Sequence, residues 1–516
     1  MRLRTLLLVI GLLVTACAGP VGAADRPARI LMGEAETLDP AAAGDAASSA
    51  VIAQLFETVT TFDANRELRP ALAESWVLED GGRRIVFTLR PGLTFSDGSP
   101  LQASDVVRSW MRLIDPSAPS PLVSLMLDVE GALDYLTGSA DASAVGLHAD
   151  DATRTVTVDL SRPAADFVTM VASPTFAIVP PSVGDDPSAL QAGDDFVASG
   201  GYRLVEATSE GLTLEANPNY WAGPPAISRI DVVTDIGGRS SVVAFEDGDL
   251  DYAPIGDDDA AWIAYDADLG PRLITVPSLS TEYYGFDTTR PPFDDVRVRQ
   301  AFAQAVDWRR IARLGASDPS AVATSMVPPG IPGRSDTDFV PVHDPDAARA
   351  LLADAGFPGG DGFPVVTLMT GGSQYDEAVV SELERELGIT VHQETMGDGY
   401  FARLATDPPQ MWSLGWVADY PGRNDFLGVL LGTGASNNYG RWSSPEFDAA
   451  IAEAGATTDA TTAGAAYDRA EAIVQRDAPL IPVSYGTGWA LVRDGLLGAG
   501  QNGLGSLRFA GLDWAS

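Results

Sequence analysis

Few residues in this chain of 516 could carry out nucleophilic or metal chemistry. It has three histidines, His148, His343 and His392, and no two of them lie at the spacing of a zinc site. All 33 basic residues are arginine, so the lysine that a phosphate-binding loop, a pyridoxal enzyme or a Ser-Lys hydrolase requires is missing. No G-x-S-x-G segment is present to hold a catalytic serine. The sequence therefore disfavours an enzyme and predicts neither a cofactor nor a metal site.

The single cysteine, Cys17, ends an N-terminal segment of the kind that directs secretion. Arg2 and Arg4 precede an apolar run over residues 6–14, which is shorter than the roughly 20 residues of a membrane span. The stretch Val14-Thr-Ala-Cys17 resembles a bacterial lipobox, which implies cleavage before Cys17 and a lipid on its sulfur. We therefore expect an extracytoplasmic protein anchored to the membrane by lipid. The alternative is an ordinary cleavable signal with an incidental cysteine.

Composition limits the choice of partner. The 71 acidic residues exceed the 33 basic ones, which gives a net charge of −38 spread along the chain. Such a surface repels phosphate backbones, so nucleic acid is not an expected partner. The hydrophobic content of 45% is sufficient for sizeable cores, and the length indicates two to four domains.

Local patterns predict an α+β unit followed by α/β structure. Residues 85–89 and 156–160 alternate as half-buried strands, and Ser104 is expected to cap a helix between them. Asp344, followed by Pro345, is expected to cap a later helix. Further along, strands at 365–369, 389–392 and 411–414 alternate with helical segments. This rhythm is typical of a largely parallel sheet, so the predicted fold class is α/β with two lobes and an extra α+β unit.

A series of short segments resembles the extracytoplasmic solute-binding proteins of the dipeptide/oligopeptide ABC-importer family, family 5. The similarity runs from about residue 28 to 490, and its segments occur in the expected order. They are ETLDP (36–40), LFE (55–57), LRPALAESW (68–76), FTLRPG (87–92), FSDG (95–98), DVVRSW (105–110), NPNYW (217–221), PFDDVRVRQ (292–300), DAAR to GF (346–357), GWVADYP (415–421) and SPEFD (444–448).

The resemblance implies a periplasmic-binding-protein-like fold in which two lobes, joined by hinge strands, close around a ligand without altering it chemically. The implied parts are lobe I at 28–60, 166–270 and 485–516, an inserted domain at 61–165, and lobe II at 271–484. Hinge crossings are expected near residues 278–285 and 481–485. The expected partners are a peptide, the permease and ATPase subunits of an importer, and the membrane through the lipid; we expect a monomer.

The same resemblance gives the leading binding residue. In peptide-binding relatives an aspartate in the stretch matching residues 415–420 pairs with the ligand's α-ammonium, and Asp419 matches it. An ammonium removed from water must meet a carboxylate and other acceptors. Trp416 and Tyr420 are expected to supply flat walls. The alternatives are a solvated loop acid for Asp419 and plain core packing for Trp416.

Four further residues are secondary candidates for ligand binding. Tyr283 and Tyr284 lie at an expected hinge crossing, and Trp442 is a third aromatic. Residues 421–426 depart from the Asp-Pro continuation of many relatives, and Arg423 there could meet a peptide carboxylate or point to solvent.

Several functions remain open at this stage. The first hypothesis is a peptide-binding component of an importer. The second is the same role for an oligosaccharide, an opine or a nickel chelate. An extracellular hydrolase is a third, and a signalling or chaperone protein of the same fold is a fourth.

Overall fold

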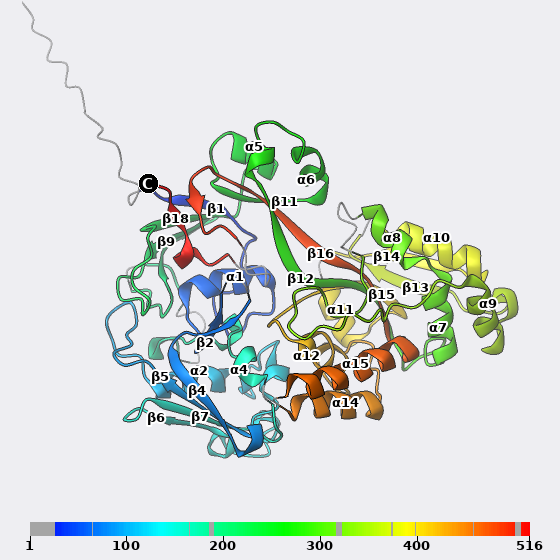
Figure 1. Cartoon of the computed structure of the whole chain (residues 1–516), viewed down its shortest axis with the longest axis horizontal. Helices are drawn as coiled ribbons and strands as arrows, with labels where there is room; N and C mark the ends of the chain where they lie inside the picture. Colours follow the sequence, from blue (N-terminus) through cyan, green and yellow to red (C-terminus); the bar gives the residue numbers. More distant parts are fainter. Residues whose placement is uncertain are drawn as a thin grey trace, which may run out of the picture.

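The computed structural model describes most of the chain, and Figure 1 shows two large parts connected by long strands. The described residues are 26–63, 66–164, 166–184, 190–193, 195–315, 322–372, 375–397, 399–457, 459–500 and 507–516. Cys17 and the secretion segment lie outside them. Within these ranges no helix has both the length and the apolar character needed to cross a membrane.

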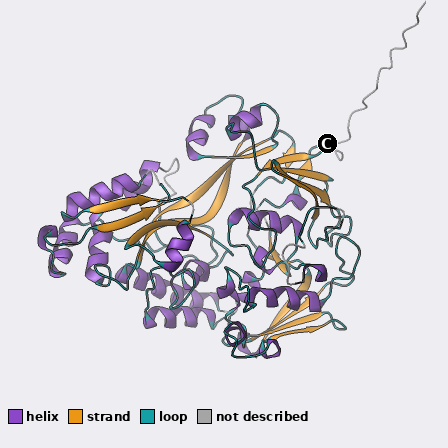
Figure 2. Cartoon of the chain, turned by 180° about the vertical axis from the view of Figure 1, so that it is seen from behind, coloured by secondary structure: helices purple, strands orange, loops and turns teal. Residues whose placement is uncertain are grey.

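The main element is a sheet that extends through both parts and has ten strands in the described residues (Figure 2). In spatial order these are β14 (Val391–Thr395), β13 (Val366–Thr370), β15 (Met411–Val417), β12 (Leu273–Phe286), β16 (Leu480–Val492), β11 (Tyr252–Ile255), β1 (Ala28–Leu31), β10 (Arg229–Val233), β9 (Gly211–Ala216) and β8 (Tyr202–Thr208).

Strands β12 and β16 belong to both parts. They pair antiparallel, and their register shifts between Pro277 and Thr281. Before the shift, β12 lies beside the end of β16 that also pairs with β11. After it, β12 lies between β16 and β15. Two strands thus cross from one lobe to the other, which confirms the expected α/β fold.

The second lobe is less parallel than its sequence rhythm predicts. Strand β13 pairs in parallel with both β14 and β15. The pairs β15–β12 and β12–β16 are both antiparallel, so strand direction alternates across β15, β12 and β16. The expectation of a largely parallel sheet is therefore correct only for three strands.

A separate small sheet lies below the first lobe in Figure 2. It consists of β4 (Ala73–Glu79), β5 (Arg84–Leu89), β7 (Thr155–Asp159) and β6 (Leu147–Asp150), all antiparallel. Helix α2 (Ala103–Met111) supplies Trp110, which packs edge-on against Phe87, Phe167 and Phe176 at 5.7–6.2 Å between ring centroids. The apolar core of this unit also takes in Tyr420 and Val429 from the second lobe.

Helices cover the lobes, and the starts of two of them test the predicted caps. Asp344 caps α9 (Pro345–Asp354) by accepting from a backbone N–H, as predicted. Ser104, in contrast, is not a cap: α2 begins directly after Gln102, and the Ser104 N–H donates to Asp151 at 2.8 Å. The other helices used below are α1 (Ala46–Leu55), α4 (Phe167–Met170), α6 (Asp257–Ile263), α7 (Val296–Ala305), α10 (Asp376–Leu387), α11 (Tyr400–Thr406), α12 (Arg423–Phe426), α14 (Pro445–Gly455) and α15 (Ala460–Asp477).

Candidate functional site

A cavity of about 550 Å³ lies where the crossing strands meet the second lobe. Strands β12, β15 and β16 form one side, α11 and the loops after β13 and β14 form another, and Asp257 of α6 reaches it from the first lobe. Figure 1 shows these strands side by side at the junction between the lobes. The volume is within the range of sites for small ligands.

Strand β15 has a free edge along this cavity. Strand β13 pairs with it only at Met411 and Trp412, so Ser413–Val417 have no partner strand on that side among the described residues. The Ala418 N–H donates to β12, and alternation then directs the backbone groups of Gly415 and Val417 away from β12. Both residues are exposed, Val417 to 42%. An extended ligand could pair with this edge.

Just beyond this edge lies a pair of carboxylates, of which Asp425 is fully buried and Asp419 is partly buried. Asp425 of α12 accepts from the Trp416 indole N–H at 2.9 Å and from the Asp419 backbone N–H at 3.2 Å. Asp419 Oδ2 and Asp425 Oδ1 are buried without a hydrogen-bond partner in the described part of the chain. Burial raises the pKa of Asp419 to about 7. Burial and the Asp419 charge together raise the pKa of Asp425 well above its ordinary value. No cationic side chain among the described residues donates a hydrogen bond to either of these two oxygens.

The carboxylate pair lies at the junction between lobe II and the inserted unit. Tyr420 is fully buried and packs into the core of the inserted unit, and Trp416 packs against the same core. The Tyr420 hydroxyl accepts from Asn424 at 3.1 Å and bonds to Asp166, just before α4. Burial, then the charge of Asp128, raises the pKa of Asp166 to about 6. Through the packing of Trp416 and Tyr420, residues 416–425 therefore connect the free edge of β15 to the inserted unit.

Tyr283 and Tyr284 both line the cavity. The Tyr284 hydroxyl donates to the fully buried Asp376 at 2.6 Å, and Thr370 donates to the other carboxylate oxygen. This network fixes the ring of Tyr284 against the start of α10.

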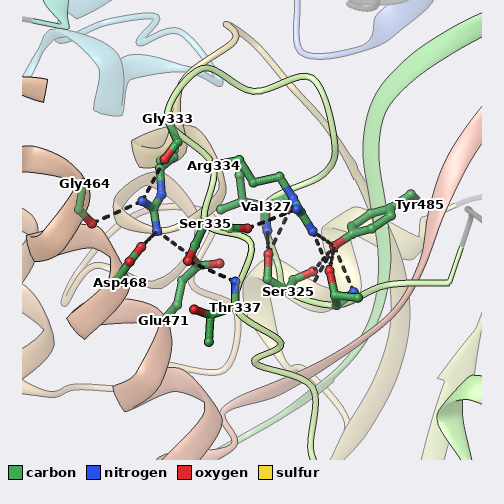
Figure 3. Close-up of polar contacts among 12 residues, drawn as sticks. Ser325, Val327, Gly333, Arg334, Ser335, Thr337, Gly464, Asp468, Glu471 and Tyr485 are labelled. Atoms are coloured by element: carbon green, nitrogen blue, oxygen red, sulfur yellow. Dashed lines mark hydrogen bonds and ion pairs between the residues drawn. The ribbon is translucent and has the colours of Figure 1, made fainter. Parts of the chain in front are cut away.

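Arg423 is directed away from the cavity, into lobe II. Its guanidinium donates to the carbonyls of Gly333 and Gly464 at 3.0 and 3.2 Å, and it pairs with Asp468 and Glu471 of α15. Figure 3 shows the four partners grouped at one place, with Arg334 extending to Tyr485 beside them. All these contacts lie within the protein, so we do not include Arg423 in the site.

Trp442 is also apart from the large cavity. It is buried in a lobe II core with its ring 5.0 Å from that of Phe447, and it borders two smaller hollows. The structure thus groups Asp419, Trp416 and Tyr420 at the junction, and Tyr283 and Tyr284 at the cavity.

Sequence analysis missed Asp425, Glu282 and the aromatic residues of the loops. Glu282 had a signal: it is an acidic residue between Thr281 and Tyr283, both of which are buried in β12. Asp425 lies in residues 421–426, the segment that departs from the family pattern, and no sequence pattern there indicated that Asp425 is buried.

Comparison with known proteins agrees with this geometry. The model of the family "Bacterial extracellular solute-binding proteins, family 5" matches residues 67–438 through its middle region. The chain belongs to this family, as its segments predicted, and it is therefore a solute-binding protein of the extracellular class.

Similarity extends over nearly the whole chain. The probable deoxycholate-binding periplasmic protein YgiS of Escherichia coli is 32% identical, over 94% of each chain. The periplasmic oligopeptide-binding protein OppA of Escherichia coli is 27% identical, also over 94% of each. The structure of the murein tripeptide binding protein MppA of Escherichia coli superimposes with a TM-score of 0.82 at 25% identity, covering 95% of this chain and 99% of that one.

Proposed function

We propose that this protein captures peptides between its lobes, does not change them chemically, and delivers them to the permease and ATPase of an ABC importer. The observation that carries the proposal is the free edge of β15, which leads from the cavity to two buried carboxylate oxygens without a partner among the described residues. Relatives named for oligopeptides and for a murein tripeptide support the same ligand class.

The arrangement suits an extended peptide. Addition of a strand to a free sheet edge supplies main-chain hydrogen bonds that do not depend on sequence, and side chains then alternate into pockets. Gly415 and Val417 provide the outward N–H and C=O groups. The α-ammonium would reach Asp419, where its charge offsets the cost of a buried carboxylate. In this proposal Trp416 and Tyr420 hold the acidic pair in place.

A bile acid is the second candidate, because the relative with 32% identity is named for deoxycholate and because the cavity is rich in aromatic side chains. Deoxycholate has a carboxylate and no ammonium. It would leave the acidic pair without a cation.

Calorimetry with trialanine, N-acetyl-trialanine and deoxycholate separates these candidates. We expect trialanine to bind, and N-acetylation to weaken binding by roughly 2–5 kcal/mol, which is about 30-fold or more. The reason is that acetylation removes the charge that Asp419 meets. Saturable binding of deoxycholate with no heat from trialanine would instead favour the second candidate.

We further propose that a lipid on Cys17 holds the protein at the membrane, and that it acts as a monomer with the lobe and insert boundaries given from the sequence. Cys17→Ala should move the protein from the membrane fraction to the soluble fraction, because one acyl-bearing cysteine is the proposed anchor. Fractionation followed by immunoblotting measures this, with Ser139→Ala as a control in the exposed surface of the insert. Equal membrane retention of both variants would contradict the anchor.

A further inference from the structure

The large cavity has a composition of its own, distinct from that of the carboxylate pair. Its walls combine many aromatic rings with two acids. The aromatic lining residues are Tyr283, Tyr284, Tyr375, Tyr400, Phe401, Tyr485 and Trp489. Arginine and histidine are both missing from its lining in the part of the chain that the structure describes, and the sequence contains no lysine. The cavity is therefore aromatic and negatively charged.

The two acids differ in what they contact. Asp257 accepts from the Trp489 indole N–H at 2.7 Å, close to where Trp489 of β16 pairs with Ile255 of β11. Glu282 has neither an ion pair nor a hydrogen bond of its side chain to any described residue. Glu282 is exposed to the cavity, and partial removal of water by the surrounding protein, then the charge of Asp376, raises its pKa. The Glu282 carboxylate thus faces the cavity without a counter-charge.

A glycine on the neighbouring strand allows this position. Gly415 pairs with Glu282 across β12 and β15, and a Cβ built at Gly415 would overlap the Glu282 carboxylate. The acid therefore lies directly over the backbone of β15, beside the edge proposed to receive the peptide. A ligand side chain entering here would meet the carboxylate and aromatic rings together.

We propose that this cavity selects an arginine side chain of the bound peptide, which pairs with Glu282 and stacks on the surrounding rings. This inference rests on the proposed peptide-binding function. Guanidinium is favoured over ammonium because it is planar, binds carboxylates in a forked geometry, stacks on aromatic faces and is weakly hydrated. Anionic ligands are disfavoured by the same two acids.

The distance along β15 sets the position of that arginine in the peptide. Gly415 and Asp419 are four residues apart, which is at most about 13 Å of extended chain. The Asp419 side chain itself spans part of that distance when it meets the α-ammonium, so the peptide brings its third or fourth residue to the cavity. The preference should therefore be confined to those positions.

Tetra-alanine peptides with one arginine, each paired with its citrulline counterpart, test this in the full chain. Citrulline keeps the shape of arginine and removes its charge. By calorimetry we expect the wild type to prefer arginine about tenfold or more at position 3 or 4, and less than about threefold at position 1.

Two matched variants locate the effect. Glu282→Gln should reduce the arginine preference to about twofold or less while still binding tetra-alanine. Glu377→Gln, which makes the same charge change at an exposed position of α10 outside the cavity, should retain the preference. Equal affinity of the wild type for arginine and citrulline peptides at every position overturns the selectivity but leaves peptide binding intact. Absence of binding by every peptide overturns both.

Discussion

Replacing Asp419 by Asn should weaken binding of trialanine by roughly 2–5 kcal/mol and leave binding of N-acetyl-trialanine nearly unchanged. The reason is that Asp419 Oδ2 is buried without a partner in the described residues and has no other cation to neutralise it. Measuring both ligands with both proteins gives a cycle that isolates the pairing of carboxylate and ammonium. A nonspecific loss of fold would weaken both ligands equally.

Asp361→Asn is a suitable control for this cycle, because Asp361 is an exposed lobe II residue outside the cavity lining. It should bind both peptides as the wild type does. If Asp419→Asn bound trialanine with unaltered affinity, Asp419 would not contact the ammonium, and the peptide would have to lie elsewhere on the edge of β15.

The same pair gives the binding a pH dependence. The pKa of Asp419 is raised to about 7, so below that pH the carboxyl holds a proton that must leave before it can pair with an ammonium. Burial and the Asp419 charge raise the pKa of Asp425. Asp425 therefore stays protonated when Asp419 ionises, and the pair carries about one negative charge. A peptide α-ammonium loses its proton near pH 7.7–8.0, about the unperturbed value. Affinity should therefore rise from pH 5 towards 7 and fall above 8, and Asp419→Asn should lose the acidic limb.

Replacing Arg423 by Ala should lower the stability of lobe II by about 3–5 kcal/mol, the cost of leaving a buried charge without its partner. Glu471, with a side chain only 2% exposed, would lose its cation, and the carbonyls of Gly333 and Gly464 would lose the Arg423 donor. Urea unfolding followed by intrinsic fluorescence measures the loss, since Trp442 lies in the same core.

Two further variants test the cause. Asp468→Ala should cost less than about 1 kcal/mol, because Asp468 is 45% exposed and its ion pair is screened by solvent. Arg423→Met combined with Glu471→Met should recover most of the lost stability, since the uncompensated charge is removed. A small effect of Arg423→Ala alone would show that Glu471 is readily neutralised in place.

The sequence predicted a local element correctly where its residues have a single common structural role. The aspartate before a proline at residues 344–345 marks the start of α9, and alternation at 85–89 marks a half-buried strand. It failed at Ser104, because the helix is capped two residues earlier, where Asp105 accepts from the Gln102 backbone N–H, and because Ser104 bonds to Asp151 instead. It also overstated the parallel character of the sheet in lobe II, since the direction of the crossing strands depends on the path of the whole chain.

The sequence by itself determined the family, through ordered segments, and it disfavoured chemistry that needs lysine, a zinc cluster or a serine elbow. Only the tertiary structure decided which charged side chains face a cavity. Asp419 and Asp425 become one acidic pair because a turn returns α12 to the end of β15, and Glu282 faces the cavity because Gly415 lies beside it. Arg423, two residues before Asp425, is held by α15 instead. Charge is a property of the residue type, but its solvation and its partners depend on contacts between segments far apart in the chain, and folding alone supplies those contacts.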